Sequence, residues 1–346
     1  NLQKYEVING VKIYRRLTTG KNSHTIVQNF KRSILFPRSV LLEVIKLCRM
    51  QQFTVIHFVG ISLLVAPSLK RLKIPLVATI ESYPSLCPKG DRMYKGKTAC
   101  TLVCNWNEFI DCQKNSSEIG KMKNRFLMKY NPFFLHYIYN HFTKLRSALK
   151  SCQLIAISEY LKQILQLHGL TSVVIPNAFE FPSNDKYKPK QISTNDPAKI
   201  LYLGSLTSFK GPQILLKALK GLPYHCDLYG EGPLKDKLNQ YILENNIDAR
   251  IHKPVPSHAV DSLYLKYDLI VYPSVWPEPF GRIPIEAIAQ GKPVLASRIG
   301  IFPELIRNDR FLFSPGDYTQ LNQKIKELLD SKNRNEYIST MTKDAR

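Results

Sequence analysis

The 346-residue sequence has no hydrophobic run long enough to span a membrane. Its most apolar stretch, Phe53 to Pro67, is short and is interrupted by Thr54, His57 and Ser62, whereas a spanning helix needs about 20 apolar residues. The chain opens with polar and charged residues, which is not the pattern of a signal peptide. We therefore expect no transmembrane helix and a cytoplasmic location.

Acidic residues are scarce in the first half of the chain. The sequence as a whole has 49 Lys+Arg and 27 Asp+Glu, for a formal net charge of +22. Residues 1–180 contain 26 of the basic but only 9 of the acidic side chains, so +17 of the charge lies there. Nucleic acid, anionic lipid and a phosphate-bearing substrate would all suit this excess.

The seven cysteines do not suggest a disulfide framework, because the expected compartment is reducing. Three lie in apolar patterns and are expected in the core: Cys48, Cys152 and Cys226. The other four are clustered, without a paired Cys-x-x-Cys: Cys87, Cys100, Cys104 and Cys112. Three alternatives stay open for this cluster, namely a structural zinc held by four thiolates, disulfides, or free thiols.

Short apolar runs alternate with helical patterns in both halves. In the first half we predict strands at Thr54 to Val59, Leu76 to Ile80, Leu154 to Ile157 and Ser172 to Ile175, with helices at Leu63 to Leu72 and Glu159 to Leu167. In the second half we predict strands at Lys199 to Leu203, Tyr224 to Tyr229, near Ile251, near Leu269 and at Pro293 to Ala296, with helices at Pro212 to Lys220, Pro233 to Glu244 and from Gly281. This alternation predicts two α/β domains with parallel, helix-covered sheets.

A polar stretch without periodicity, residues 182–198, is the predicted linker. It divides the chain into an N-terminal domain, 1–181, and a C-terminal domain, 199–346. The N-terminal domain carries an insertion, roughly residues 84–150, that holds the clustered cysteines and a basic-aromatic stretch.

The most informative string, PSVWPEPFGRIPI, extends from Pro273 to Ile285. It leads from a strand end into a helix expected to begin near Gly281. Glu278 lies just before that helix, and Glu286 lies eight positions further on. Two carboxylates around an anion site suit a ligand with a diphosphate in the middle and sugars at both ends, as in a nucleotide-sugar. In isolation, they would be ordinary acids that complement a helix dipole.

The predicted helix start supplies the anion site itself. Backbone N–H groups of Phe280, Gly281 and Arg282 have no partners within a helix that begins here, and such groups bind phosphate readily. Gly281 has no side chain to block the approach, and Arg282 adds positive charge.

The longer string from Pro273 to Ser297, PSVWPEPFGRIPIEAIAQGKPVLAS, closely resembles the signature of the fourth sequence family of glycosyltransferases, the group 1 glycosyl transferases. The resemblance implies a GT-B fold, in which two Rossmann-like domains face each other across a cleft. It also implies sugar transfer from a nucleotide-sugar with retention of anomeric configuration and no cofactor required for catalysis. No Asp-x-Asp motif is present, which would be expected if a divalent ion carried the diphosphate.

The loop from Gly204 to Gly211 resembles the family's strand-end loop, whose cations contact the donor diphosphate. Lys210 fits this pattern, whereas Ser205 stands where an Arg is usual. The resemblance implies that the charge of Lys210 stabilises the leaving diphosphate.

Other donor-binding positions are implied by the same resemblance. Gly230 and Gly232 match a turn that passes under the nucleotide, and Lys253 to Val255 falls where the backbone reads the base. Glu286 corresponds to the carboxylate that binds ribose, and Glu278 to the one that faces the donor sugar.

On the acceptor side, Glu81 comes directly after a predicted strand, where many relatives place a His. It is expected either to bind sugar hydroxyls in the cleft or to be solvated. Relatives open with a strand and a Gly-rich turn that are not recognisable here, and Tyr5 to Tyr14 resembles the family's segment just after that turn. We therefore expect the N-terminal domain to lack its first strand unit.

Lys121 to Lys150 mixes cations with aromatic residues. This composition suits an interfacial membrane segment, and equally a helix that buries its aromatics against its own domain. Many relatives act on lipid-linked acceptors, so we expect a lipid-linked or saccharide acceptor and a peripheral position on an anionic, cytoplasmic membrane face.

Two rival functions remain. One is a GT-B phosphorylase or sugar-phosphate synthase with a soluble acceptor. The other is a nucleic-acid-binding protein, which the basic first half would suit, although no recognition motif supports it and the Glu278–Glu286 string would go unexplained.

Overall fold

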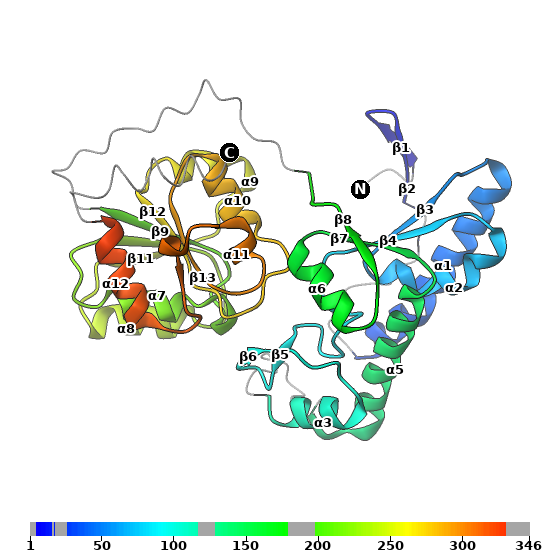
Figure 1. Cartoon of the computed structure of the whole chain (residues 1–346), viewed down its shortest axis with the longest axis horizontal. Coiled ribbons are helices and arrows are strands. Elements are labelled where there is room, and N and C mark those ends of the chain that lie inside the picture. Colours follow the sequence, from blue (N-terminus) through cyan, green and yellow to red (C-terminus); the bar gives the residue numbers. More distant parts are fainter. Residues whose placement is uncertain (1–4, 16, 18–25, 117–128, 179–197, 330–346) are drawn as a thin grey trace.

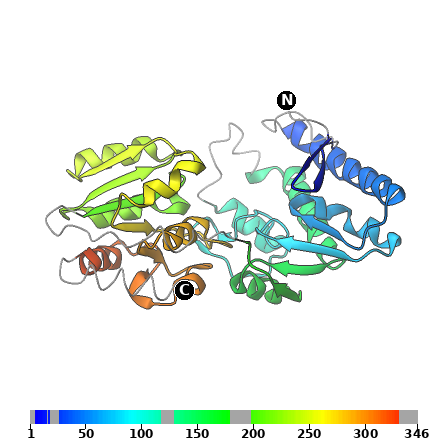
Figure 2. The ribbon, with the colours of Figure 1, turned by 90° about the horizontal axis from the view of Figure 1, so that it is seen from above.

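The computed structural model describes residues 5–15, 17, 26–116, 129–178 and 198–329, with only the backbone for residues 26–32. We call the part built on the sheet of residues 56–174 the N-terminal unit, and the part built on the sheet of residues 199–313 the C-terminal unit (Figures 1 and 2). Nearly all of the predicted linker, 182–198, lies outside the described residues. The domain limits at 1–181 and 199–346 therefore stay predictions.

The N-terminal unit has a four-stranded parallel sheet in the order β3-β4-β7-β8. These strands are β3 (Ile56–Val59), β4 (Leu76–Ile80), β7 (Gln153–Ala156) and β8 (Ser172–Val174). The helices around the sheet are α1 (Ile26–Met50), η1 (Gly60–Val65), α2 (Ala66–Leu69), η2 (Lys70–Leu72), α5 (Pro132–Leu149) and α6 (Glu159–Leu167). A two-stranded hairpin, β1 (Tyr5–Ile8) with β2 (Val11–Tyr14), precedes them.

The helix predicted at Leu63 to Leu72 is instead three short helical pieces, η1, α2 and η2. Pro67 lies in the first turn of α2, and proline has no N–H with which to continue a preceding helix. Residues from the first two pieces still reach the core, because Leu63, Ala66 and Leu69 are fully or almost fully buried.

The C-terminal unit has a six-stranded parallel sheet in the order β11-β10-β9-β12-β13-β14. Its strands are β9 (Lys199–Leu203), β10 (His225–Tyr229), β11 (Ala249–His252), β12 (Leu269–Tyr272), β13 (Val294–Ser297) and β14 (Leu312–Phe313). Strand order reverses between β9 and β12. Loops at the carboxyl ends of two such strands diverge, and ligands of doubly wound sheets bind in the crevice that this leaves.

Helices cover both faces of this sheet (Figure 1). α7 (Pro212–Leu219), α8 (Lys235–Glu244) and α12 (Tyr318–Leu329) pack together on one face. α9 (Ser257–Tyr264) and α10 (Arg282–Ala289) pack together over the other. Further short elements are η4 (Ser208–Lys210), α11 (Phe302–Leu305) and η5 (Asp309–Phe311). All four residues of β12 are buried, as expected for a central strand covered on both faces.

The two units contact each other through α6 and the loop between β12 and α10 (Figure 1). Ser158 caps α6 and its hydroxyl also donates to the carbonyl of Pro279 (3.0 Å). The carboxylate of Glu304 accepts hydrogen bonds from the backbone N–H groups of Glu159 and Tyr160, each 3.1 Å long. The C-terminal unit thus supplies an anion to a helix start of the N-terminal unit, which the helix dipole favours.

The insertion forms β5 (Met93–Tyr94), β6 (Thr98–Ala99) and α3 (Trp106–Lys114), and it continues into α5. The capping box of α3 joins Asn105 and Glu108, whose side chains exchange hydrogen bonds with each other's backbone. Among the helices that the structure describes, none is long and apolar enough to cross a membrane.

Candidate functional site

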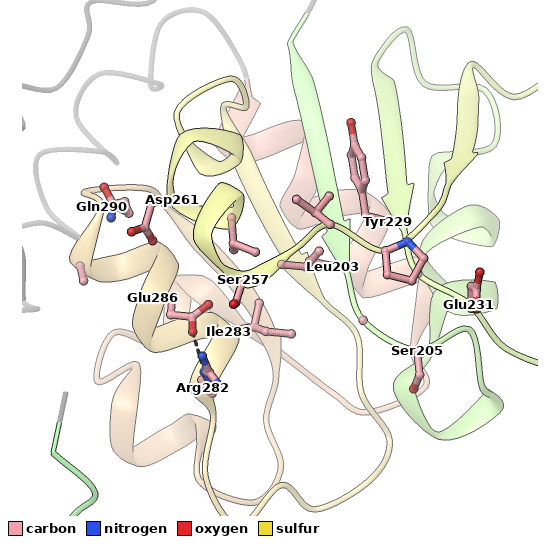
Figure 3. Close-up of a pocket in the computed structure, with 16 residues that line it drawn as sticks. Leu203, Ser205, Tyr229, Glu231, Ser257, Asp261, Arg282, Ile283, Glu286 and Gln290 are labelled. Carbon is pink, nitrogen blue, oxygen red and sulfur yellow. Dashed lines mark hydrogen bonds and ion pairs between the residues drawn. The ribbon is translucent and has the colours of Figure 1, made fainter. Parts of the chain in front are cut away.

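A cavity of about 910 Å³ opens at the carboxyl ends of β9 and β10, opposite α9 and α10 (Figure 3). Five predicted donor-site residues line it: Gly204, Ser205, Gly230, Arg282 and Glu286. Pro254 and Val255, from the segment predicted to read a base, line it as well. The structure therefore brings together residues that are far apart in the sequence, at the crevice where the strand order reverses.

Glycine is required at the floor of this cavity because two strand ends approach closely. A Cβ atom at Gly230 would lie 1.9 Å from the carbonyl oxygen of Gly204. At Gly232 it would lie 2.4 Å from the carbonyl oxygen of Leu206. The two predicted turn glycines thus allow the loops after β9 and β10 to pack against each other, and only Gly230 is part of the lining.

Glu286 points into the cavity from the middle of α10 (Figure 3). Its Oε1 accepts a hydrogen bond from Nε of Arg282 (2.7 Å), one turn earlier. Its Oε2 accepts one from the hydroxyl of Tyr264 on α9 (3.0 Å). The carboxylate is thus held in place by two donors, and each oxygen keeps a second acceptor position for a ligand hydroxyl.

α10 begins at Arg282, with Gly281 as its N-cap residue and without a side-chain hydrogen bond at that cap within the described residues. A Cβ atom at Gly281 would lie 2.9 Å from both Leu305 and Phe302 of α11. The absent side chain therefore allows α11 to pack closely here. Close packing is thus one reason for glycine at this position, and the predicted open approach for a ligand stays a prediction.

Lys210 and Glu278 lie outside the cavity lining and form an ion pair with each other. Glu278 is only 5% exposed. The hydroxyl of Tyr272 donates to its Oε1 (3.2 Å), and Lys210 lies 4.6 Å from the ring centroid of Trp276. Burial raises the pKa of Glu278 above its ordinary value, although the charge of Lys210 opposes this shift.

The residues on either side of Glu278 attach its loop to the N-terminal unit. The hydroxyl of Tyr83 donates to the carbonyl of Pro277. The indole N–H of Trp276 donates to the carbonyl of Asp91 (2.6 Å). Phe280 packs against the cores of both units, which is a structural role that the sequence did not reveal.

Glu81 lies at the carboxyl end of β4 and lines a second cavity, about 210 Å³ in volume. The remainder of that lining is mostly apolar, with His141 and Ser85 among its polar members. Glu81 is thus separate from the 910 Å³ cavity, although Tyr83, two positions further on, contacts the Glu278 loop.

Sequence reasoning missed several residues of the donor-side cavity. Tyr229 stacks on His252, with ring centroids 4.5 Å apart, and Tyr229 lines the cavity next to Gly230. Asp261 of α9 and Gln290 also line it. The strand-end position of Tyr229 could have indicated its role, but the sequence carries no signal for Asp261.

The four clustered cysteines line one small cavity in the insertion. All seven cysteines are free thiols. Within the described residues, no three His, Cys, Asp or Glu side chains are already arranged to hold a metal ion. Cys87, Cys100, Cys104 and Cys112 are therefore close together without forming a closed zinc ligand set.

The basic-aromatic stretch is described only from residue 129, so Lys121, Lys123, Arg125 and Phe126 lie outside the described residues. Tyr139 of α5 stacks on Phe109 and contacts Trp106 of α3. Phe133, at the start of α5, is 85% exposed. Several of the described aromatics therefore pack within the unit, whereas Phe133 and Tyr130 are exposed.

Comparison with known proteins gives the family of the C-terminal half of the chain and supports the fold. Residues 183–345 match the model of the family described as glycosyl transferases group 1. An uncharacterized glycosyltransferase of Methanocaldococcus jannaschii is 30% identical over 191 residues, covering 49% of this chain and 48% of that protein. The sulfoquinovosyl transferase SQD2 of Arabidopsis thaliana is 27% identical over 162 residues, covering 44% and 31%. The matches thus span about half or less of the curated relatives.

Two solved structures align with most of the chain. The Anabaena protein HepE in complex with UDP-glucose gives a TM-score of 0.61 at 20% identity, covering 89% of this chain and 77% of that one. Sucrose-phosphate synthase from Thermosynechococcus elongatus gives 0.64 at 18% identity, covering 99% and 82%. At such identities the alignments establish the fold, and the chain has the GT-B fold.

Proposed function

Residues 183–345 belong to the group 1 glycosyl transferases, and from this premise we propose that the protein transfers a sugar from a nucleotide-sugar to an acceptor, with retention of anomeric configuration. The observation that carries the proposal is the placement of Glu286 in the 910 Å³ cavity at the strand-order reversal. That volume is within the range of about 300–1,000 Å³ typical of ligand sites.

The donor lies across the cavity with its nucleoside against the β9 and β10 ends. The carboxylate of Glu286 accepts hydrogen bonds from the ribose hydroxyls. Pro254 and Val255 lie beside the base, and the start of α10, with Arg282, faces the diphosphate. The side chain of Arg282 is 72% exposed, so it can turn toward a phosphate without leaving a buried position.

Lys210 and Glu278 act at the reacting end. The side chain of Lys210 is 22% exposed and that of Glu278 only 6%, so the lysine has the freer path toward a ligand. Lys210 stabilises negative charge on the departing diphosphate, while Glu278 faces the hydroxyls of the donor sugar. Because the usual Arg is replaced by Ser205, Arg282 supplies the second cation.

The acceptor binds on the side of the N-terminal unit, next to Glu81 and the 210 Å³ cavity. The departing phosphate and the positioning of the acceptor hydroxyl together activate the attack. The reaction needs no metal ion, because cationic side chains and backbone N–H groups carry the diphosphate, and no Asp-x-Asp motif is present. A lipid-linked acceptor at an anionic, cytoplasmic membrane surface suits the +17 charge of residues 1–180.

The donor assignment is tested with Glu286→Gln, which keeps the size of the side chain and removes its charge. The ligand is UDP-glucose, or the nucleotide-sugar with UDP, GDP or ADP that the unaltered chain binds best. We expect the variant to bind it at least about tenfold more weakly, since a hydrogen bond to a charged group contributes about 1.5–3 kcal/mol. Isothermal titration calorimetry measures this, and Glu244→Gln, at the exposed end of α8, is the matched control. Unchanged donor affinity in Glu286→Gln would remove the basis of the proposal.

A further inference from the structure

We propose that Cys87, Cys100, Cys104 and Cys112 bind one zinc ion through their four thiolates, and that this ion stabilises the segment on which the Trp276 loop docks. The site is separate from the donor cavity and serves structure rather than sugar transfer.

Four separate positions of the insertion converge on one point. Cys87 lies in the turn after β4, Cys100 directly follows β6, Cys104 precedes the N-cap of α3, and Cys112 lies on α3 itself. All four line the same cavity of about 20 Å³. A single water-sized sphere needs about 10–15 Å³ on this measure, so the space suits one ion.

Four thiolates cannot share so small a space unless a cation compensates their charge. A divalent ion with a preference for sulfur supplies that compensation.

A backbone N–H group already donates to one sulfur of the cluster. The N–H of Lys95 donates to Sγ of Cys112 (3.2 Å). Such bonds stabilise the anionic sulfur and orient it, as outer-shell donors do around bound metals.

A buried cation next to the cluster points to an anionic centre. The side chain of Lys89 is 7% exposed, with Nζ 3.7 Å from Sγ of Cys112 and 3.4 Å from Asp91. A buried ammonium group is costly unless anions compensate its charge.

A tetrathiolate zinc centre has a net charge of about −2, because four thiolates surround one Zn²⁺. It would thus offset the charge of Lys89, whose Nζ lies 3.7 Å from Sγ of Cys112. Neutral thiols or disulfides offer no such charge, which favours the metal over the two alternatives that the sequence left open.

Ion binding requires the four thiols to move closer together. Zinc–sulfur bonds are about 2.3 Å long, and the described residues contain no group of three or more His, Cys, Asp or Glu side chains already placed to hold a metal ion. Each thiol that binds releases its proton to water.

The ion would lie under the contact between the two units. The turn from Cys87 leads directly to Asp91, whose carbonyl accepts the indole hydrogen bond of Trp276. Cys100 N–H donates to the carbonyl of Arg92 (2.7 Å), which links the second ligand to the same turn. The metal would thereby fix the position of the Asp91 carbonyl relative to the Glu278 loop.

The test is the metal content of the full chain, purified without chelators and measured by mass spectrometry of the elements. We expect one zinc per chain, retained in the control Cys48→Ser with Cys152→Ser and lost in Cys100→Ser with Cys104→Ser. Because the second variant could fail to fold, the unaltered chain is also loaded with Co²⁺, for which we expect a thiolate-to-cobalt charge-transfer band.

Metal at the background level together with no cobalt band would overturn the proposal. So would an intact mass of the unreduced chain that shows the hydrogens lost in disulfide formation. As a second readout, removal of the metal should shift the emission of Trp276 to longer wavelength in a Trp106→Phe background, because its partner carbonyl becomes mobile. Donor affinity is measured separately with Glu286→Gln, so each proposal can fail independently.

Discussion

The buried ion pair of Lys210 and Glu278 allows a quantitative prediction. Replacing Lys210 by Met keeps an unbranched side chain but removes the charge that faces Glu278 and lies over the ring of Trp276. Within the described part of the chain, Glu278 then keeps hydroxyl donors alone, from Tyr272 at 3.2 Å and Ser274 at 3.5 Å. A carboxylate that is only 5% exposed is costly to leave ionised under these conditions.

The size of the effect depends on pH, because Glu278 can take up a proton instead. Breaking a buried pair typically costs about 3–5 kcal/mol. Protonation of a carboxyl with an ordinary pKa of 4.5 costs about 1.4 kcal/mol for each pH unit above that value. Protonation of Glu278 therefore limits the free energy of unfolding that Lys210→Met loses to about 5 kcal/mol near pH 8 and to about 1.4 kcal/mol near pH 5.5.

The direction in which stability changes with pH follows from the linkage between protonation and folding. Without Lys210 the pKa of Glu278 in the folded state rises further above 4.5, so the folded chain binds more protons than the unfolded one. Stability therefore falls as pH rises from 4.5 through the folded-state pKa. The wild type shows the same trend in a narrower window, because Lys210 opposes the shift.

Urea unfolding of the wild type, Lys210→Met, Glu278→Gln and the double variant, each near pH 5.5 and pH 8, measures these effects. We expect Lys210→Met to be more destabilising at the higher pH and the double variant to recover most of that loss. Lys217→Met, whose Nζ lies over the Tyr318 ring at 5.6 Å, is the control. Equal losses at both pH values, with additive single effects, would refute the reasoning.

Two further predictions concern other polar contacts. Burial, with Arg146 and Arg92 nearby, lowers the pKa of His168 to about 4. The free energy of unfolding should therefore fall by at most about 3 kcal/mol as pH drops from 6.5 to 4. In His168→Asn this free energy, measured by urea unfolding at several pH values, should depend less on pH in that range, and an unchanged pH dependence would contradict the assignment. Glu304→Gln should lower the free energy of unfolding by about 1 kcal/mol, because two N–H groups at the start of α6 lose a charged acceptor. Thermal unfolding measures this, with Glu244→Gln as the control variant. Equal melting temperatures of the two variants would contradict the prediction.

The strands were largely predictable because their apolar runs are short and bounded. Leu76–Ile80 and Lys199–Leu203 begin and end where the sequence predicted. Helix α1, at Ile26–Met50, was not predicted. Pro37 lies inside it, and an internal proline normally argues against a helix. Tertiary packing, through buried Val40 for example, offsets that local preference.

The site was predictable where one continuous string carries it. Glu286 and Arg282 lie in the same motif and line the same cavity. The ion pair between Glu278 and Lys210 was not predictable, because the two residues are 68 positions apart. The sequence predicts a contact with the donor for each of them and none between them. Glu304 is 145 positions from Glu159, so no sequence pattern could indicate that it caps α6.

The loop between β12 and α10 therefore combines two tasks that are usually considered separately. Glu278 is buried at its centre and paired with Lys210. Trp276, Pro277 and Pro279 around it bond to the N-terminal unit. A ligand that attracts Lys210 raises the cost of keeping Glu278 ionised, and this cost falls on the segment that joins the units. On the proposed function, donor binding would for this reason be energetically linked to the contact between the units through one carboxylate.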